Sequence, residues 1–108
     1  MKNVLLILAL FLGFMLACND DDDNETLPSN EIRMSDSTFI PVNTSVSAGT
    51  TVRWLNNSSV AHTVTSNDEL FDAYLQVGED FSFTFDNPGT YNYMCVIHQG
   101  MVGSIVVR

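Results

Sequence analysis

The stretch Tyr91-Asn92-Tyr93-Met94-Cys95-Val96-Ile97-His98-Gln99-Gly100-Met101 joins a strand pattern to a run of metal-binding side chains. Tyr91, Tyr93 and Cys95 fall on one face of a predicted strand, because successive side chains of a strand point to opposite sides of the sheet. Cys95, His98 and Met101 follow at intervals of three. On a regular strand this spacing would separate neighbouring members onto opposite faces. We therefore predict that the strand ends at Cys95 and that a loop brings these three side chains together.

A second histidine, His62, lies far upstream in a valine- and threonine-rich run. A period of two places His62 on the same face as the apolar Val64, which is predicted to face the core. A side chain at this position can point inward beneath the loop, whose turn is permitted by Gly100 and Gly103. The predicted site thus takes one side chain from a strand and three from a loop, at one end of the domain.

One cysteine and two histidines with a weak methionine form the ligand set of a blue-copper site, where sulfur suits Cu(I) and imidazole suits both oxidation states. The candidate metal ligands are His62, Cys95, His98 and Met101. Each has an alternative role when taken alone, since a lone cysteine is usually a small buried hydrophobe and a histidine or methionine can simply fill the core. Met94 is excluded because it points away from the face of Cys95. The joint pattern favours one copper ion, cycling between Cu(I) and Cu(II).

The rest of the chain from residue 32 carries further strand signals. Phe81-Ser82-Phe83-Thr84-Phe85 alternates strictly, and Trp54 shares an apolar face with Val52, which places Trp54 in the core. Turn-forming residues separate the strand signals at 48–49, 56–59, 77–80 and 86–89. Many short strands without a convincing helix predict an all-β antiparallel sandwich, with 66–76 as a long loop. Pro88-Gly89-Thr90-Tyr91 is typical of a tyrosine corner, in which the tyrosine hydroxyl bonds backbone across a turn.

Four stretches together resemble a known family. They are Gly49-Thr50-Thr51-Val52-Arg53-Trp54-Leu55-Asn56, Ala61-His62-Thr63-Val64-Thr65-Ser66, Asn87-Pro88-Gly89-Thr90-Tyr91-Asn92-Tyr93-Met94-Cys95 and His98-Gln99-Gly100-Met101-Val102-Gly103. With them, roughly residues 37–108 resemble the cupredoxin superfamily, the small blue (type 1) copper proteins of the plastocyanin/amicyanin type. The C-x2-H-x2-M spacing resembles the short ligand loop of amicyanin-like members, whereas Thr63 stands where many members have Asn. The resemblance implies a cupredoxin-like Greek-key β-sandwich.

Residues 1–17 are predicted to be a lipoprotein-type signal peptide. Lys2 is followed by an apolar run from Val4 to Leu16, which is too short for a comfortable membrane-spanning helix. The run ends at Ala17-Cys18 instead of an A-x-A cleavage site. This ending favours acylation of Cys18, which would become the first residue of the mature chain. Ordinary signal cleavage nearby and an uncleaved anchor are the alternatives.

Residues 18–31 are predicted to form an acidic flexible tether before the copper-binding domain, residues 32–108. Six of the 13 acidic residues lie in this tether, so the segment repels itself and has little to bury. Its four consecutive aspartates lack the shaping glycine and bidentate glutamate of a calcium loop. A net charge of −9 excludes a typical nucleic-acid-binding protein.

These patterns together predict a monomeric electron carrier, tethered by lipid to a membrane in the periplasm or at the surface of a bacterium, with a redox protein as donor and another as acceptor. An enzyme is not expected, because both histidines are already metal ligands and four protein ligands leave no open coordination position. His98 is the expected exit path for the electron. An apolar docking rim is expected from Val96, Ile97, Val102 and Leu70. The alternative function is a copper-binding module for storage, sensing or delivery, built on the same ligands.

Overall fold

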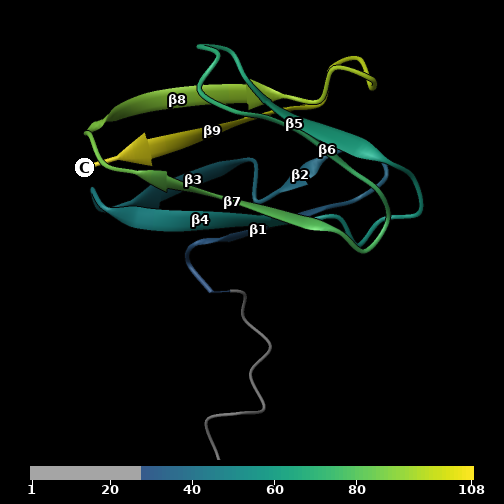
Figure 1. Ribbon diagram of the computed structural model, residues 1–108, viewed down its shortest axis with the longest axis horizontal. Coiled ribbons are helices and arrows are strands. Elements are labelled where there is room, and N and C mark those ends of the chain that lie inside the picture. Colours follow the sequence, from purple (N-terminus) through teal and green to yellow (C-terminus); the bar gives the residue numbers. More distant parts are fainter. Residues whose placement is uncertain (1–27) are drawn as a thin grey trace, which may run out of the picture.

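The computed structural model describes residues 28–108, whose regular structure consists of β-strands. The strands are β1 (Glu31–Met34), β2 (Phe39–Ile40), β3 (Asn43–Val46), β4 (Thr50–Leu55), β5 (His62–Ser66), β6 (Asp72–Leu75), β7 (Asp80–Phe85), β8 (Gly89–Met94) and β9 (Val102–Val107). They form two facing sheets, with strand orders β2-β1-β4-β7 and β3-β9-β8-β5-β6 (Figure 1). The predicted all-β sandwich is confirmed. Over 28–108, no helix combines the length and apolar character that crossing a bilayer requires.

Each sheet contains one parallel strand pair in an otherwise antiparallel arrangement. In the first sheet β1 runs parallel to β4, and in the second β3 runs parallel to β9. Parallel neighbours need a long connection that returns the chain to its starting end. Between β1 and β4 that connection includes β3, which belongs to the opposite sheet. The crossing of the chain between sheets therefore explains why the strand directions are mixed.

A cluster of aromatic side chains lies at the centre of the core between the sheets. Trp54 is fully buried, as its place in the alternating pattern predicts, and its ring centroid lies 5.4 Å from those of both Phe71 and Tyr93. Phe81 and Phe85 of β7 pack against the same indole. Burying a side chain of this size stabilises a fold by about 1.5–3 kcal/mol. This cluster fixes the two sheets against each other beneath β8.

The segment 66–76, which was expected to be a long loop, contains the edge strand β6. β6 pairs antiparallel with β5 and places Leu75 opposite His62. Its sequence, Asp72-Ala73-Tyr74-Leu75, has no β-branched residue and only one buried side chain, so local propensity does not mark it as a strand. Pairing with β5 overrides that weak propensity. The expectation of a long loop was therefore wrong for these four residues and for Ser66, the last residue of β5.

The hairpin β8–β9 depends on one tyrosine and two glycines. The Tyr91 hydroxyl donates a 2.7 Å hydrogen bond to the carbonyl of Asn87, which confirms the predicted tyrosine corner. Gly100 has a φ of 83° and so provides the turn expected of it. Gly103 has a different role from the one predicted, because it does not adopt a positive φ. A Cβ at this position would overlap the ring of Tyr93 on the neighbouring strand.

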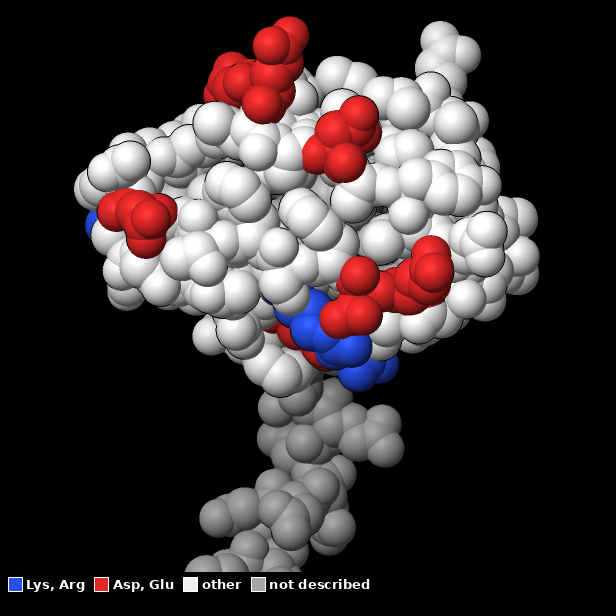
Figure 2. Space-filling view, viewed as in Figure 1, with Lys and Arg blue, Asp and Glu red and all other residues white. Residues whose placement is uncertain are grey.

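Charged side chains gather where β1, β4 and β7 lie side by side. Figure 2 shows acidic groups scattered over the side of the molecule in view, and basic atoms mainly beside acidic ones at its lower edge. Arg53 forms ion pairs with Glu31 and Asp80, and Arg33 also pairs with Glu31. Glu31, which takes part in two of these ion pairs, is the first residue of β1 and lies one residue before the predicted start of the domain. Cys18 and the predicted signal peptide lie outside the described residues, as does most of the predicted tether.

Candidate metal centre

Three of the four predicted ligands meet at one end of the second sheet, at the loop between β8 and β9 (Figure 1, right). The sulfur of Cys95 lies 3.7 Å from Nδ1 of His62 and 3.4 Å from Nδ1 of His98. One ligand atom from each of these residues lies within 4.8 Å of the others. His62 and Cys95 are buried, whereas His98 is partly exposed. The centre is therefore inside the protein and reaches the surface at His98.

His62 is held as the first residue of β5, on the inward face that also carries Val64. The connection leading to it is organised by Asn56, which is fully buried. The Asn56 side-chain amide donates to the carbonyls of Val60 and Leu75, and its oxygen accepts from the backbone N–H of Ser58. The sequence indicated only a turn here. Asparagine's ability to bond nearby backbone was the available signal for this role.

The environment of His62 favours the neutral imidazole. Burial lowers its pKa, and the neighbouring His98 lowers it further. The backbone of Ser35 and the charge of Asp36 act in the opposite direction and raise the pKa of His62. Among the described residues, none forms a hydrogen bond to Nε2 of His62. Metal ions bind histidine in its neutral form. The lowered pKa therefore prepares His62 for metal binding without prior loss of a proton.

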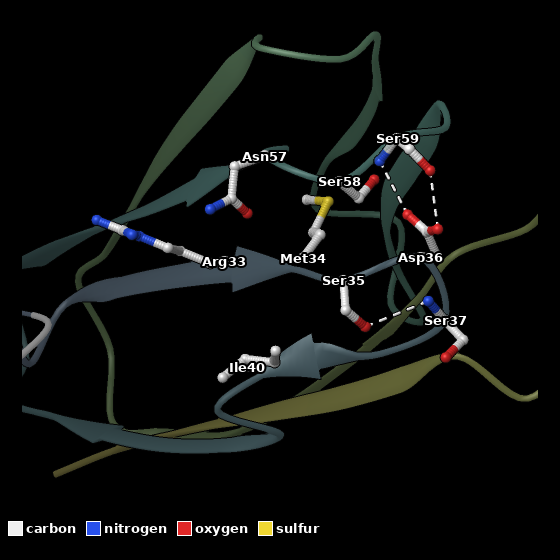
Figure 3. Close-up of a pocket in the computed structure, with 9 residues that line it drawn as sticks. All are labelled: Arg33, Met34, Ser35, Asp36, Ser37, Ile40, Asn57, Ser58 and Ser59. Atoms are coloured by element: carbon white, nitrogen blue, oxygen red, sulfur yellow. Dashed lines mark hydrogen bonds between the residues drawn. The ribbon is translucent and has the colours of Figure 1, made fainter.

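Asp36 lies in the turn between β1 and β2, at the edge of an open groove (Figure 3). Its carboxylate accepts hydrogen bonds of 2.8 Å from both the backbone N–H and the hydroxyl of Ser59. These bonds lower the pKa of Asp36. They also tie the β1–β2 turn to the connection that precedes His62. The groove itself contains none of the predicted ligands, so we assign it no part in the metal site.

The loop from Cys95 to Met101 is closed by its own backbone. The N–H of Cys95 donates to the carbonyl of Met101 at 2.9 Å, and the N–H of Met101 donates to the carbonyl of His98 at 3.3 Å. The Met101 side chain is only 2% exposed. The fourth predicted ligand is therefore buried in the same loop that carries Cys95 and His98.

Thr63 contacts both Cys95 and the residue after it. The sequence alone left the contacts of Thr63 open. Its backbone N–H donates to the Cys95 sulfur at 3.3 Å. Its hydroxyl oxygen accepts from the backbone N–H of Val96 at 2.9 Å. A hydrogen bond to the atom that would bind a metal helps to orient that side chain. Thr63 thus contacts both the sulfur of Cys95 and the residue that follows it.

The distances fit a single small metal ion. Metal–nitrogen and metal–sulfur bonds in proteins are about 2.0–2.3 Å long. Three such ligands around one ion lie about 3.5–4 Å apart by simple geometry, close to the two distances measured from the Cys95 sulfur. One thiolate, two imidazoles and a buried thioether are the donors of a type 1 copper site. The residues present therefore fit one copper ion.

The surface around His98 is apolar, as expected for three of the four predicted rim residues. Val96, Ile97 and Val102 are 59%, 50% and 56% exposed. Leu70, the fourth, instead lines a pocket with Phe83 and Tyr91. It follows the end of β5 opposite to His62, so its inclusion in the rim was wrong. The sequence pattern could not place Leu70, because it did not show where the turn after β5 ends and β6 begins.

Comparison with known proteins points to one family. A family model described as a cupredoxin-like domain matches residues 5–107. The plastocyanin of Scenedesmus fuscus is 37% identical over 84 residues, which cover 65% of this chain and 86% of that protein. The chloroplastic plastocyanin of Tetradesmus obliquus is 30% identical over 110 aligned residues, covering 89% of this chain and 74% of its own.

Solved structures agree with these matches. A purple cupredoxin from Nitrosopumilus maritimus superposes with a TM-score of 0.68 at 30% identity, covering 72% of this chain and 98% of its own. A reduced amicyanin variant gives a TM-score of 0.69 at 25% identity, covering 78% of this chain and 87% of its own. The fold, the donor atoms and the family match coincide in the same residues. The chain belongs to the cupredoxin-like domain family and is similar to plastocyanins and amicyanins.

Proposed function

We propose that this protein is an exported, lipid-anchored type 1 copper protein that carries single electrons between a donor and an acceptor protein. The observation that carries the redox function is the approach of the Cys95 sulfur to Nδ1 of both His62 and His98. Plastocyanins and amicyanins, the similar proteins, are electron carriers and not enzymes. Export and anchoring rest on the sequence of residues 1–31.

The ligands divide their tasks by burial. Copper, when bound, supplies a one-electron exchange between Cu(I) and Cu(II). Cys95 and Met101 hold their sulfur atoms away from solvent, and His62 holds a buried imidazole on a strand. His98 carries the partly exposed edge of the site. A partner protein that docks on the apolar residues around His98 would exclude water and shorten the path for the electron.

The same ligands could serve copper storage, sensing or delivery, the alternative function. Delivery requires that an acceptor reach the metal and replace its ligands one by one. Here His62, Cys95 and Met101 are each less than 5% exposed, so only His98 is accessible for such exchange. This burial favours retention of the ion and therefore electron transfer.

Adding Cu(II) to the purified protein tests the redox function. We expect one copper per chain, a strong blue absorption from thiolate-to-copper charge transfer, and a reversible one-electron potential with fast self-exchange. Rapid loss of copper to a competing ligand, without reversible electrochemistry, would instead support delivery. Failure to bind copper at all would refute both functions.

The lipid anchor is tested at the native N-terminus. If Cys18 is acylated, the protein extracted from cells should partition with membranes, because each buried methylene contributes about 0.8 kcal/mol and stable anchoring takes more than one acyl chain. Cys18→Ala should leave an unprocessed or mislocalised precursor with unchanged copper binding. Mass spectrometry that finds a free, unmodified end at Asn19 or beyond would refute the anchor.

A further inference from the structure

The outer face of the second sheet carries a chain of polar side chains that leads from solvent to the ligand loop. Thr65 of β5 lies opposite Asp72 of the edge strand β6, and their side chains are 2.9 Å apart, Oγ1 to Oδ1. Thr63, two residues earlier on the same face, lies 3.0 Å from Thr65, Oγ1 to Oγ1. The Thr63 hydroxyl oxygen in turn accepts from the N–H of Val96, next to Cys95. Asp72 is exposed, Thr65 is partly exposed and Thr63 is buried.

The Thr65 hydroxyl is the donor at both of its contacts, to the Asp72 carboxylate and to the Thr63 hydroxyl oxygen. A threonine hydroxyl has a single proton, so these two acceptors share it. The Thr63 oxygen thus accepts from two sides, from the Thr65 hydroxyl and from the Val96 N–H.

The series of hydrogen bonds reaches the ligand loop at the point where the backbone pairing of β5 and β8 stops. Their ladder includes Thr65 opposite Met94 and Ser66 opposite Tyr93. The same register would next place Thr63 opposite Val96, but there the side chain of Thr63 accepts the bond in place of a backbone carbonyl. The Thr63 backbone N–H is thereby free to donate to the Cys95 sulfur. The position of Thr63 therefore determines both where the strand ends and what the sulfur contacts.

We propose that Asp72 and Thr65 are positioning residues of the copper site, acting through Thr63 on the ligand loop. Linked hydrogen bonds polarise one another, and a bond that ends on a charged acceptor is stronger than a neutral one. The Asp72 carboxylate thus holds the Thr65 hydroxyl beside Thr63, and Thr65 in turn holds the Thr63 hydroxyl where it accepts from the Val96 N–H. This positions the residue next to Cys95. The proposal rests on the proposed copper site, although its hydrogen-bond chain can be tested in the metal-free protein.

A matched set of variants separates the hydrogen-bond chain from simple charge. Thr65→Val breaks the chain and leaves the Asp72 charge, whereas Asp72→Ala removes both the charge and the final acceptor. Thr84→Val removes an exposed threonine pair, Thr51 with Thr84 at 2.7 Å, in the other sheet. Asp68→Ala removes a nearby exposed acidic group whose carboxylate makes no described hydrogen bond to Thr65. The last two variants are the controls.

The first measurement is the hydrogen-exchange rate of the Val96 N–H in the metal-free protein. Loss of a hydrogen bond costs about 0.5–1.5 kcal/mol, so exchange should rise about three- to tenfold in Thr65→Val and in Asp72→Ala. The double variant should show no more than either single change, because both cut the same chain. The controls should leave this rate unchanged. An unchanged rate in Thr65→Val, or equal effects of Asp68→Ala and Asp72→Ala, would overturn the proposal.

The second measurement is the thiolate-to-copper absorption of the copper-loaded protein. Thr65→Val and Asp72→Ala should shift this band, because Thr63 also donates to the sulfur, and the controls should not. A band that stays in place in both variants would contradict the positioning role, even if Val96 exchanged faster. If the unaltered protein bound no copper, the proposed function would fail on its own, and the exchange rates would still decide whether the chain holds the loop.

Discussion

Strand β8 ends in two contrasting ways. At its start, the Tyr91 hydroxyl bonds the carbonyl of Asn87, and the turn before the strand is closed by that pairing. At its other end, Cys95 leaves the strand with its sulfur facing two imidazoles. The same period-two alternation delivers Tyr91 and Cys95 to one face. At the first end, a side chain forms a hydrogen bond to the backbone and so stabilises the fold. At the second end, several side chains place metal-binding atoms close together and so form a candidate binding site.

Cys95→Ser is expected to have the largest effect, and to act only at the ligand end of β8. A hydroxyl cannot replace the thiolate as a copper ligand, so the blue absorption should vanish completely. The fold should survive, because serine fits the space of cysteine and the tyrosine corner is untouched. Absorption and circular dichroism measure the two effects. A Ser variant that stays blue would mean that the sulfur of Cys95 is not a ligand.

Gly103→Ala should disturb β8 near its ligand end, because Gly103 lies against Tyr93, the next-to-last residue of the strand. The added methyl group would overlap the Tyr93 ring, and overpacking of this kind usually costs about 1–3 kcal/mol. We expect a lower free energy of unfolding in urea. Val102→Ala, at the preceding and exposed residue of β9, is the control. Equal stability of the two variants would show that the space beside Tyr93 is not limiting.

Met101→Leu should keep copper and colour while raising the reduction potential, because loss of a weak sulfur donor destabilises Cu(II). Leucine has a similar volume, so the stability of the fold should change by less than about 1.5 kcal/mol. Voltammetry and thermal unfolding test the two parts. Complete loss of copper would assign Met101 a structural role in place of a weak axial one.

Tyr91→Phe tests the structural end of β8 alone. It removes the hydroxyl that bonds Asn87 and should cost about 1 kcal/mol of stability, the usual contribution of one hydrogen bond. The blue absorption and the reduction potential should not change. A shift of the absorption band would show that the two ends are coupled along the strand, contrary to the division described above.

The smallest expected effect concerns Asp36, beside the connection to His62. Its hydrogen bonds to Ser59 lower its pKa below the ordinary 3.8, so the ionised form stabilises the fold. That contribution is fully present above the ordinary pKa and is lost as the pH falls through the lowered value. Asp36→Asn should therefore be slightly less stable than the unaltered protein near neutrality. Urea unfolding at a series of acidic pH values should show this difference shrinking below about pH 4.

Sequence reasoning succeeded where a pattern was local and strongly periodic. The alternation around Trp54 predicted a buried side chain, and Pro88-Gly89-Thr90-Tyr91 predicted the tyrosine corner. It failed for β6, whose residues become a strand only through pairing with β5. It also assigned Gly103 to a turn. The actual reason for a glycine there, the close ring of Tyr93, lies on another strand and is not visible in the local sequence. The failures all involve a partner segment that the local pattern does not name.

The sequence by itself determined the donor set of the site. Cys95, His98 and Met101 lie within seven residues, and their spacing and chemistry are legible without a structure. Only the tertiary structure decided how His62, 33 positions before Cys95, comes within 3.7 Å of its sulfur. It also decided that Thr63 ends the β5–β8 ladder with its side chain. Contacts between distant segments depend on strand register, and register is set by the packing of the whole sandwich.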